Sequence, residues 1–374
     1  MIHGGWRRAP GGSDDPARRA AVVVAVLTTG LFAVGVVRVG VSLSRTAERS
    51  GTPEPLALPV IPLEFEGVSL ETYLAAWVPD SQRDELLRSP VLRDPDFARR
   101  VHWWMRYWTG PASGWFPDFL ARMAWLGGTV DSTLAVRDLP PSLRYLPLIE
   151  SGYAPGVTSH ASAVGLWQLM GPTARGLGLE VGPMVDERRS WERSTEAALT
   201  YLEDLREEFD SWFLALAAYN TGPTRVRRIL RRHAPDAPRS DSLFWALRDQ
   251  FAPETRDFMP KLYGAMWVAS RPDAYGFELP SVEPLTFDTV SVPDRTPLDV
   301  VARAAGVPHD EILRLNPEFV QGITPGGGGV VVRLPRGRRE VFASAYARIP
   351  TSEKAGLVES ATETTPQPQA TPPS

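Results

Sequence analysis

Hydrophobic residues recur at helical spacing early in the chain. Between residues 95 and 135, Val101, Met105 and Trp108 follow one another at intervals of four and three, which is typical of one face of a helix. The segment FLARMAWLGG ends on Gly127 and Gly128, and helices often end at glycine, so we expect a helix to stop there. The tryptophans of this region are expected to pack between helices, because large aromatic side chains dominate protein cores. Residues 63–137 are therefore predicted to be helical.

The helical pattern continues to about residue 284. The segment 211–219, SWFLALAAY, is apolar on almost all sides and predicts a helix buried at the domain centre. Pro223 then opens a basic helix, because proline suits the first helical position. An apolar stripe between charged faces is formed by Ala198, Leu202, Leu205 and Phe209. No convincing strand precedes residue 285, so the fold class is mainly α, with one helical domain over residues 138–284.

The pattern changes after Pro284. Residues 289–292 and 330–335 read as strands, and residues 297–306 and 309–317 between them read as two short helices. We interpret residues 285–338 as a small, separate β-α-α-β domain. Residues 339–374 form a tail that is rich in Thr, Pro, Ser and Gln toward its end, and from about residue 351 we expect it to be disordered.

The N-terminus carries an apolar segment. Residues 20–37 contain no charge, and the apolar character resumes after Arg38 as far as Leu43. A helix of this length crosses most of a bilayer, and the basic residues 1–19 favour a cytoplasmic N-terminus, so residues 20–43 are predicted to be a membrane anchor. The alternative is a cleaved signal peptide. Residues 44–62 contain four prolines and predict an extended linker. In either case the domains that follow are exported.

Composition excludes several classes of function. Residues 50–374 carry 33 basic and 41 acidic residues, and this acidic balance argues against nucleic acid as a partner. The chain has no cysteine, so disulfides, thiol catalysis and cysteine-based metal sites are excluded. Its five histidines are scattered, which argues against a metal site. We therefore expect neither a metal nor another cofactor.

Residues 139–179 hold the densest chemical signal. Glu150 follows the apolar run 145–149, and a carboxyl group in apolar surroundings has a raised pKa. A proton held near neutral pH is what protonation of a glycosidic oxygen requires. Taken alone this signal is weak, because most glutamates at helix ends are solvated. Downstream, Gly165 permits close approach of backbone, and Gln168 offers an amide suited to sugar hydroxyl or acetamido groups.

The motifs, taken in order, resemble a known family. ESGYAP, AVGLWQLM, GPTARGLGL, VDERR and LALAAYNTGPTRV, ending with PETRDFMPKL, are similar to the catalytic domain of soluble lytic transglycosylases, a goose-lysozyme-like family. The closest resemblance is to the membrane-bound lytic murein transglycosylase D type. Residues 285–338 resemble a LysM glycan-binding module, although the usual Gly-Asp-Thr-Leu entry is replaced by residues 293–296.

The resemblance implies a lysozyme-like helical fold and a cell-envelope enzyme that cleaves the glycan strands of peptidoglycan. It implies that Glu150 is the catalytic acid and base. It also implies a set of substrate-binding residues, namely Ser159, Gln168, Met170, Tyr219, Asn220 and Glu254. A hydrolytic muramidase and a non-catalytic wall-binding scaffold are the alternatives.

A second catalytic carboxylate is difficult to find in the sequence. Residues 151–179 contain no Asp or Glu, and Glu180, Asp186 and Glu187 lie in a charged stretch that looks solvated. Two-carboxylate glycosidases need a partner close to the acid. Glu254 is a distant alternative, but the resemblance places it near the muramic acid or its peptide. The resemblance implies that the acetamido group of the substrate stabilises the developing positive charge instead, so we expect non-hydrolytic cleavage that leaves 1,6-anhydro-muramic ends. We also expect removal of residues 286–374 to spare activity on soluble fragments and to weaken retention on intact sacculi.

Overall fold

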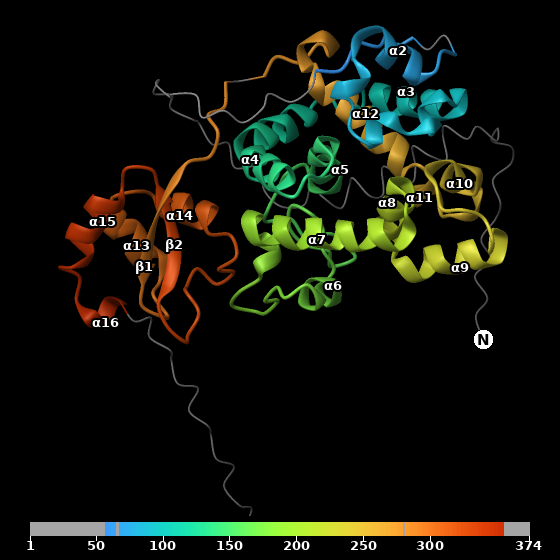
Figure 1. Cartoon of the computed structure of the whole chain (residues 1–374). Coiled ribbons are helices and arrows are strands. Elements are labelled where there is room, and N and C mark those ends of the chain that lie inside the picture. The colour runs from blue at the N-terminus through green and yellow to red at the C-terminus, as the bar shows by residue number, and fades with distance from the viewer. Residues whose placement is uncertain (1–56, 65–66, 280, 355–374) are drawn as a thin grey trace, which may run out of the picture.

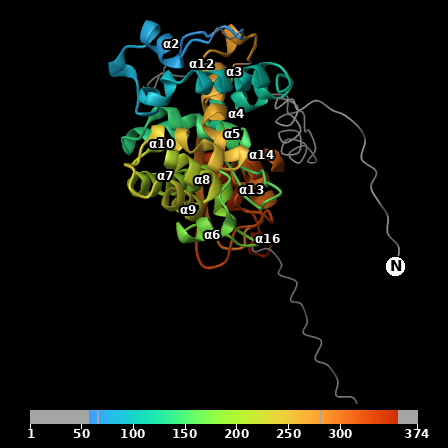
Figure 2. The same cartoon turned by 90° about the vertical axis from the view of Figure 1, so that its right-hand side faces the viewer.

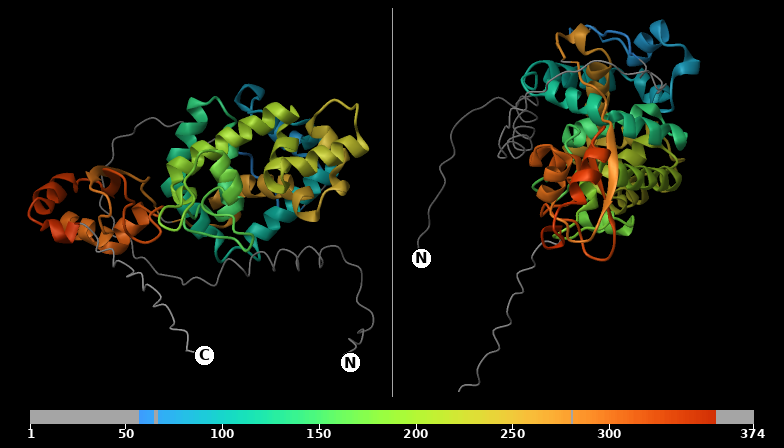
Figure 3. Two further views of the ribbon diagram at one scale, coloured as in Figure 1. Left: turned by 90° about the horizontal axis from the view of Figure 1, so that it is seen from below. Right: turned by 90° about the vertical axis from the view of Figure 1, so that its left-hand side faces the viewer.

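The computed structural model describes residues 57–64, 67–279 and 281–354. It contains a larger body made of helices and a smaller body with a two-stranded sheet, which lie side by side (Figure 1, Figure 3). The mainly α fold class is confirmed for this part of the chain. The larger body supplies every candidate site residue named above.

The first helices of the larger body are α2 (Leu70–Trp77), α3 (Pro95–Thr109) and α4 (Phe116–Val136). Asp94 starts α3, since its side chain accepts hydrogen bonds from the N–H groups of Asp96 (2.8 Å) and Phe97 (3.1 Å). Val101, Met105 and Trp108 are all buried, so the predicted helix and the packing role of this tryptophan are confirmed.

The prediction that a helix ends at Gly127 and Gly128 is wrong. α4 continues to Val136, and Gly127 lies inside it. A side chain on Gly127 would approach Nη2 of Arg144 to 3.2 Å, and Arg144 forms an ion pair with Asp131 of the same helix at 2.9 Å. The absence of a side chain at Gly127 therefore leaves space for the Arg144 side chain to pack against α4.

The rest of the larger body is built from eight helices in the described residues. They are α5 (Leu146–Ser151), α6 (Gly171–Gly176), α7 (Trp191–Phe209), α8 (Trp212–Thr221), α9 (Pro223–His233), α10 (Asp241–Ala246), α11 (Pro253–Arg256) and α12 (Phe258–Ser270).

The predicted stripe of α7 is buried along its whole length, and seven consecutive residues of α8 from Trp212 to Ala218 are buried, which confirms both predictions. α12 packs against α3, and a side chain on Gly264 would approach Cβ of Trp104 to 2.7 Å. Figure 2 shows α2, α3 and α12 at one end of this body and α6 at the other.

Short 3-10 helices join these elements. They comprise η1 (Asp80–Gln82), η2 (Leu86–Arg88), η3 (Pro90–Arg93), η4 (Pro141–Tyr145), η5 (Glu187–Arg189), η6 (Arg248–Gln250) and η7 (Pro272–Tyr275).

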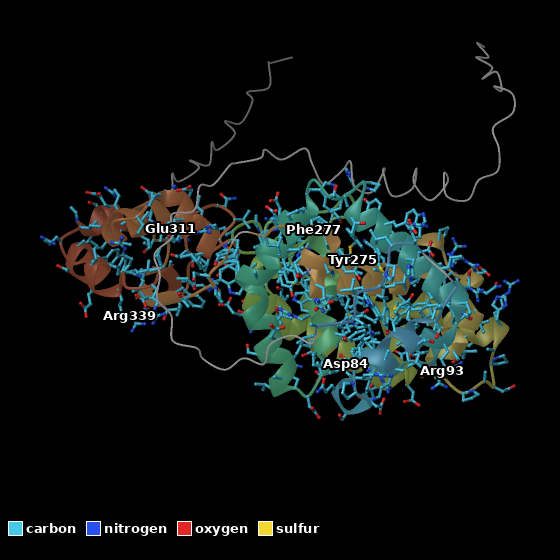
Figure 4. The ribbon with its side chains drawn as sticks, turned by 90° about the horizontal axis from the view of Figure 1, so that it is seen from above. Asp84, Arg93, Tyr275, Phe277, Glu311 and Arg339 are labelled. Carbon is cyan, nitrogen blue, oxygen red and sulfur yellow. The ribbon has the colours of Figure 1, made fainter. Side chains whose placement is uncertain are left out.

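The smaller body has the predicted β-α-α-β order. β1 (Phe287–Val292) pairs antiparallel with β2 (Val330–Pro335), with Phe287 opposite Pro335 and Val292 opposite Val330. Between them lie α13 (Leu298–Ala305) and α14 (His309–Leu315). Figure 4 shows Glu311 and Arg339 on this body, apart from the larger one.

The predicted tail contains helices that the sequence pattern did not indicate. α15 (Arg339–Tyr346) packs against α13 and buries Phe342, and α16 (Thr351–Lys354) is a further short turn of helix. The structure thus begins the predicted disordered stretch with a turn of helix at residues 351–354, and residues 355–374 lie outside the described residues.

The N-terminal predictions fall mostly outside the described residues. Residues 1–19 and 20–43 are among these, and no helix in the described part of the chain is long and apolar enough to cross a membrane. The end of the predicted linker is packed, because Leu58 and Ile61 are buried. The indole of Trp267 donates to the carbonyl of Pro59 (2.9 Å), and the N–H of Ile61 donates to the hydroxyl of Tyr275 (2.9 Å), which is labelled in Figure 4.

Candidate active site

Glu150 lies near the end of α5, a short helix whose other residues are all buried. Gly152 ends this helix in the left-handed conformation (φ +59°), and a side chain on it would approach the ring of Phe119 to 2.4 Å. Glu150 itself is half-buried. Burial raises the pKa of its carboxyl group to about 7; the charge of Lys261 opposes this rise, and the charge of Glu254 adds to it. The predicted desolvation of Glu150 agrees with this geometry.

Lys261 is a site residue that the sequence analysis missed. Its ammonium group donates to the carbonyl of Ile149 at 2.9 Å, one residue before Glu150. Burial lowers the pKa of Lys261, while the charges of Glu150 and Glu254 raise it. The signal that could have found it is a single charged residue in the otherwise uncharged helix α12.

Tyr219 lies near the end of α8 and faces the same region. Its hydroxyl donates to the carbonyl of Trp167 at 2.6 Å, and its ring lies 5.8 Å from the ring of Tyr201. Burial raises the pKa of Tyr219 well above its usual value, and the charge of Glu150 raises it further. The Tyr219 hydroxyl therefore stays protonated. The indole of Trp167 is fully buried and donates to the hydroxyl of Thr195 (2.9 Å), so the Trp167 side chain belongs to the core.

A compact loop, residues 156–170, carries Ser159 and Gln168. The hydroxyl of Ser159 accepts from the N–H of Ala163 (3.1 Å), and its own N–H donates to the carbonyl of that residue (2.8 Å). Gln168 has a left-handed backbone (φ +51°), and its amide nitrogen donates to the carbonyl of Gly165 (2.9 Å). In this structure both side chains bond within their own loop and hold its shape.

The side chain of Arg188 holds this loop through backbone carbonyls. Its guanidinium donates to the carbonyls of Ser162 and Leu169, each at 3.1 Å. A side chain on Gly165 would lie 1.8 Å from the backbone oxygen of Arg188, so only glycine fits there. The expectation that Asp186 is solvated is wrong, because it is 6% exposed and both its oxygens accept from Arg188, at 2.9 and 2.8 Å.

The remaining predicted residues lie at the edges of this arrangement. The side-chain oxygen of Asn220 accepts from the hydroxyl of Thr255 (2.8 Å), which links α8 to α11. Glu254, the neighbour of Thr255, is exposed and close enough for its charge to act on Glu150. Met170 is 43% exposed and precedes α6. In the described residues there is no group of three or more His, Asp or Glu side chains suited to a metal ion.

The structure thus brings three side chains close enough to Glu150 to interact with its charge. These are Lys261, Glu254 and Tyr219, and Tyr219 is bonded to the residue that precedes Gln168. A carboxyl group with a pKa near neutrality, placed beside a protonated phenol, can donate a proton and later take one back.

Two family models match the chain. Residues 133–240 match the transglycosylase SLT domain, and residues 286–351 match the LysM-like domain of lytic transglycosylase MltD. Membrane-bound lytic murein transglycosylase D of Escherichia coli strain K12 is 32% identical over 209 residues, which are 55% of this chain and 44% of that protein. A putative tributyltin chloride resistance protein of Alteromonas sp. strain M-1 is 41% identical over 95 residues, 25% of this chain and 46% of that protein.

The chain spans less than half of the length of these curated relatives. Among solved structures, the 70 kDa soluble lytic transglycosylase of Escherichia coli has 20% sequence identity and a TM-score of 0.34, over 54% of this chain and 35% of that one. The motif resemblance is confirmed by the two domain matches. The chain is therefore similar to membrane-bound lytic murein transglycosylase D over 55% of its length, and it carries a match to the transglycosylase SLT domain followed by a match to the LysM-like domain of MltD.

Proposed function

We propose that this protein is a lytic transglycosylase of cell-wall remodelling, which cleaves the β-1,4 bond between MurNAc and GlcNAc in peptidoglycan and leaves 1,6-anhydro-muramic ends. The observation that carries the proposal is the half-buried Glu150, whose pKa of about 7 leaves a proton available near neutrality. It lies within the segment that matches the SLT domain, and the homologue is named for the same activity.

Glu150 acts twice in the proposed reaction. In its protonated form it gives its proton to the glycosidic oxygen, and the bond from the anomeric carbon to that oxygen breaks. The acetamido group of the substrate stabilises the positive charge that develops at the anomeric carbon. The Glu150 carboxylate then accepts the proton of the C6 hydroxyl as that oxygen bonds to the anomeric carbon. No water is consumed, and Glu150 ends in its starting form.

Neither of the other carboxylates considered as a base provides a clear route to hydrolysis. Asp186 is held by Arg188 and is not free to act as a base. Glu254 is the remaining candidate base for a muramidase; it is exposed on α11, and the family motifs place it near the muramic acid or its peptide. A non-catalytic scaffold is the third candidate, and it has no use for a carboxyl group held protonated near neutral pH.

Product analysis tests the proposal. Purified sacculi are digested with the full-length protein in water labelled with heavy oxygen, and the released muropeptides are weighed. Each anhydro product is lighter by one water than its hydrolysed counterpart and carries no label. Products with only labelled reducing ends would make the protein a muramidase, and absence of any product would leave the scaffold.

The substrate-binding roles follow the family motifs. Gln168, Met170 and Glu254 are proposed to contact the glycan or its peptide, and Ser159, Tyr219 and Asn220 to line the same region. The LysM-like domain is proposed to bind peptidoglycan strands as well. Binding to sacculi tests these roles without cleavage when it is measured in the Glu150→Gln background. Retention of this variant is compared with that of the same variant carrying Gln168→Ala or Met170→Ala.

The location is proposed from the N-terminal sequence and from the homologue, which is named as membrane-bound. Residues 20–43 anchor the protein in the inner membrane, and the catalytic part works in the periplasm; signal cleavage is the alternative. Two measurements distinguish an uncleaved anchor from a cleaved signal peptide. They are the N-terminal sequence of the mature protein and whether detergent or salt releases it from membranes.

A further inference from the structure

The two bodies share their hydrophobic cores. Leu315, at the end of α14 in the LysM-like domain, belongs to the core of the larger body, and Val185, from the SLT side, belongs to the core of the LysM-like domain. The rings of Trp191 and Phe287 meet edge to face at 6.4 Å, and the N–H of Leu285 donates to the carbonyl of Trp125 on α4 (2.8 Å). Such interlocking is expected of a fixed interface rather than of a tethered module.

Arg333 of β2 is the polar centre of this interface. Its guanidinium binds both carboxylate oxygens of Glu192 on α7 at 2.9 and 2.6 Å, and donates to Glu318 of its own domain at 2.6 Å. It also lies 4.7 Å from the ring centre of Trp191. The Arg333 side chain is 12% exposed and the Glu192 side chain 34% exposed, so this bidentate ion pair is partly shielded from solvent.

The interface continues as backbone pairing with the segment 183–186. The N–H of Val320 donates to the carbonyl of Met184 (3.0 Å), and the N–H of Asp186 donates to the carbonyl of Glu318 (3.0 Å). Gln321 donates to the carbonyl of Pro183 (3.2 Å). The LysM-like domain thus fixes the backbone of Asp186.

Asp186 is also the residue that holds Arg188. Both oxygens of its carboxylate accept hydrogen bonds from the Arg188 guanidinium. The guanidinium in turn donates to the carbonyls of Ser162 and Leu169, which lie on either side of Gly165 in the sequence. The other side of the same loop is held by the hydroxyl of Tyr219 through the Trp167 carbonyl. The Ser151 hydroxyl also donates to the Leu166 carbonyl (2.7 Å), so residues 156–170 are held at several points. The support through Arg188 is the one that depends on the LysM-like domain.

We infer that the docked LysM-like domain, through Arg333, Asp186 and Arg188, positions the loop that carries Gln168 beside Glu150. Asp186 and Arg188 are positioning residues, because they act through the loop and not on the glycan. The consequence for turnover rests on the function proposed above, whereas the coupling between domain and loop does not.

Hydrogen–deuterium exchange of the full-length protein tests the coupling. Arg333→Ala removes the ion pair with Glu192 across the interface. Glu192→Gln weakens this contact while leaving Arg333 paired with Glu318. Arg303→Ala is the control, since it removes only an exposed ion pair with Glu353. The amides of Asp186 and Val320 report docking. The loop is reported by the bonded amides of Val164, Gly165 and Leu169.

We expect exchange at both sets of amides to rise at least tenfold in Arg333→Ala, less in Glu192→Gln, and not at all in Arg303→Ala. If Arg333→Ala unfolds the LysM-like domain, Glu192→Gln alone decides. Faster exchange at Asp186 and Val320 with an unchanged loop overturns the inference, and so does unchanged exchange at both sets.

A second measurement uses short soluble glycan fragments, which a tethered wall-binding module would not affect. We expect kcat/KM to fall on the order of tenfold in Arg333→Ala, because small misplacements of site residues are costly. Loss of retention on sacculi with full activity on short fragments would leave only a binding role for the domain. If the unmodified protein cleaves nothing, the proposed function fails, and the exchange result still decides the coupling.

Discussion

At the scale of single residues, Glu150 carries the chemistry, so its substitution is the most direct test. Glu150→Gln keeps the size of the side chain but has no proton to give. General acid and base groups each contribute roughly 10²–10⁴-fold in rate, and one group here serves as both. We therefore expect the loss of muropeptide release to lie at or beyond the upper end of that range, with unchanged circular dichroism. Glu180→Gln, at an exposed site, is the matched control. A Glu150→Gln variant that keeps a tenth of the activity would remove Glu150 from the mechanism.

The charges around Glu150 predict how activity depends on pH. The first step needs a protonated Glu150, whose pKa is raised to about 7, so kcat/KM should fall as pH rises through about 7. The Lys261 cation lowers the pKa of Glu150 and the Glu254 charge raises it. Lys261→Met should therefore move the falling limb to higher pH, and Glu254→Gln should move it to lower pH. Limbs that move in the same direction, or do not move, contradict this assignment.

At the scale of elements, the loop 156–170 depends on a buried glycine, Gly165. Gly165 and Gly178 both have left-handed backbones, with φ of +85° and +81°, but a side chain on Gly165 would strike the Arg188 backbone and one on Gly178 would meet nothing within 4 Å. Gly178→Ala should cost about 1–2 kcal/mol from backbone strain. Gly165→Ala should cost more than this and also reduce activity. Equal losses of stability in urea unfolding for the two variants would show that the contact with Arg188 is unimportant.

At the scale of the whole molecule, the shared interface changes the effect expected of truncation. Removal of residues 286–374 uncovers Trp191 and Trp125 and leaves the backbone of residues 184–186 without its partners. We expect the midpoint of thermal unfolding to fall by roughly 5–10 °C, from the lost burial of a few apolar side chains. A chain that lacks only residues 355–374 is the control. Equal midpoints for both truncated chains would show that the domains are independent.

The sequence by itself determined the local features of this protein. α3, α7 and α8 and the β-α-α-β order follow from periodicity, which depends on neighbours a few residues away. The apolar run before Glu150 likewise indicated a desolvated carboxyl group, because the residues that desolvate it include its own neighbours in the chain. The family motifs added the identity of the domains.

Only the tertiary structure decided which distant residues meet. Arg333 and Glu192 are 141 positions apart, and Lys261 and Ile149 are 112 apart, so no local pattern pairs them. The same holds for Gly127. Its sequence context predicts a helix end, whereas in the structure the Arg144 side chain packs against it inside α4. The break in pattern at Pro284 indicated a second domain, but whether it is tethered or docked depends on contacts between surfaces, and these arise only when both domains have folded.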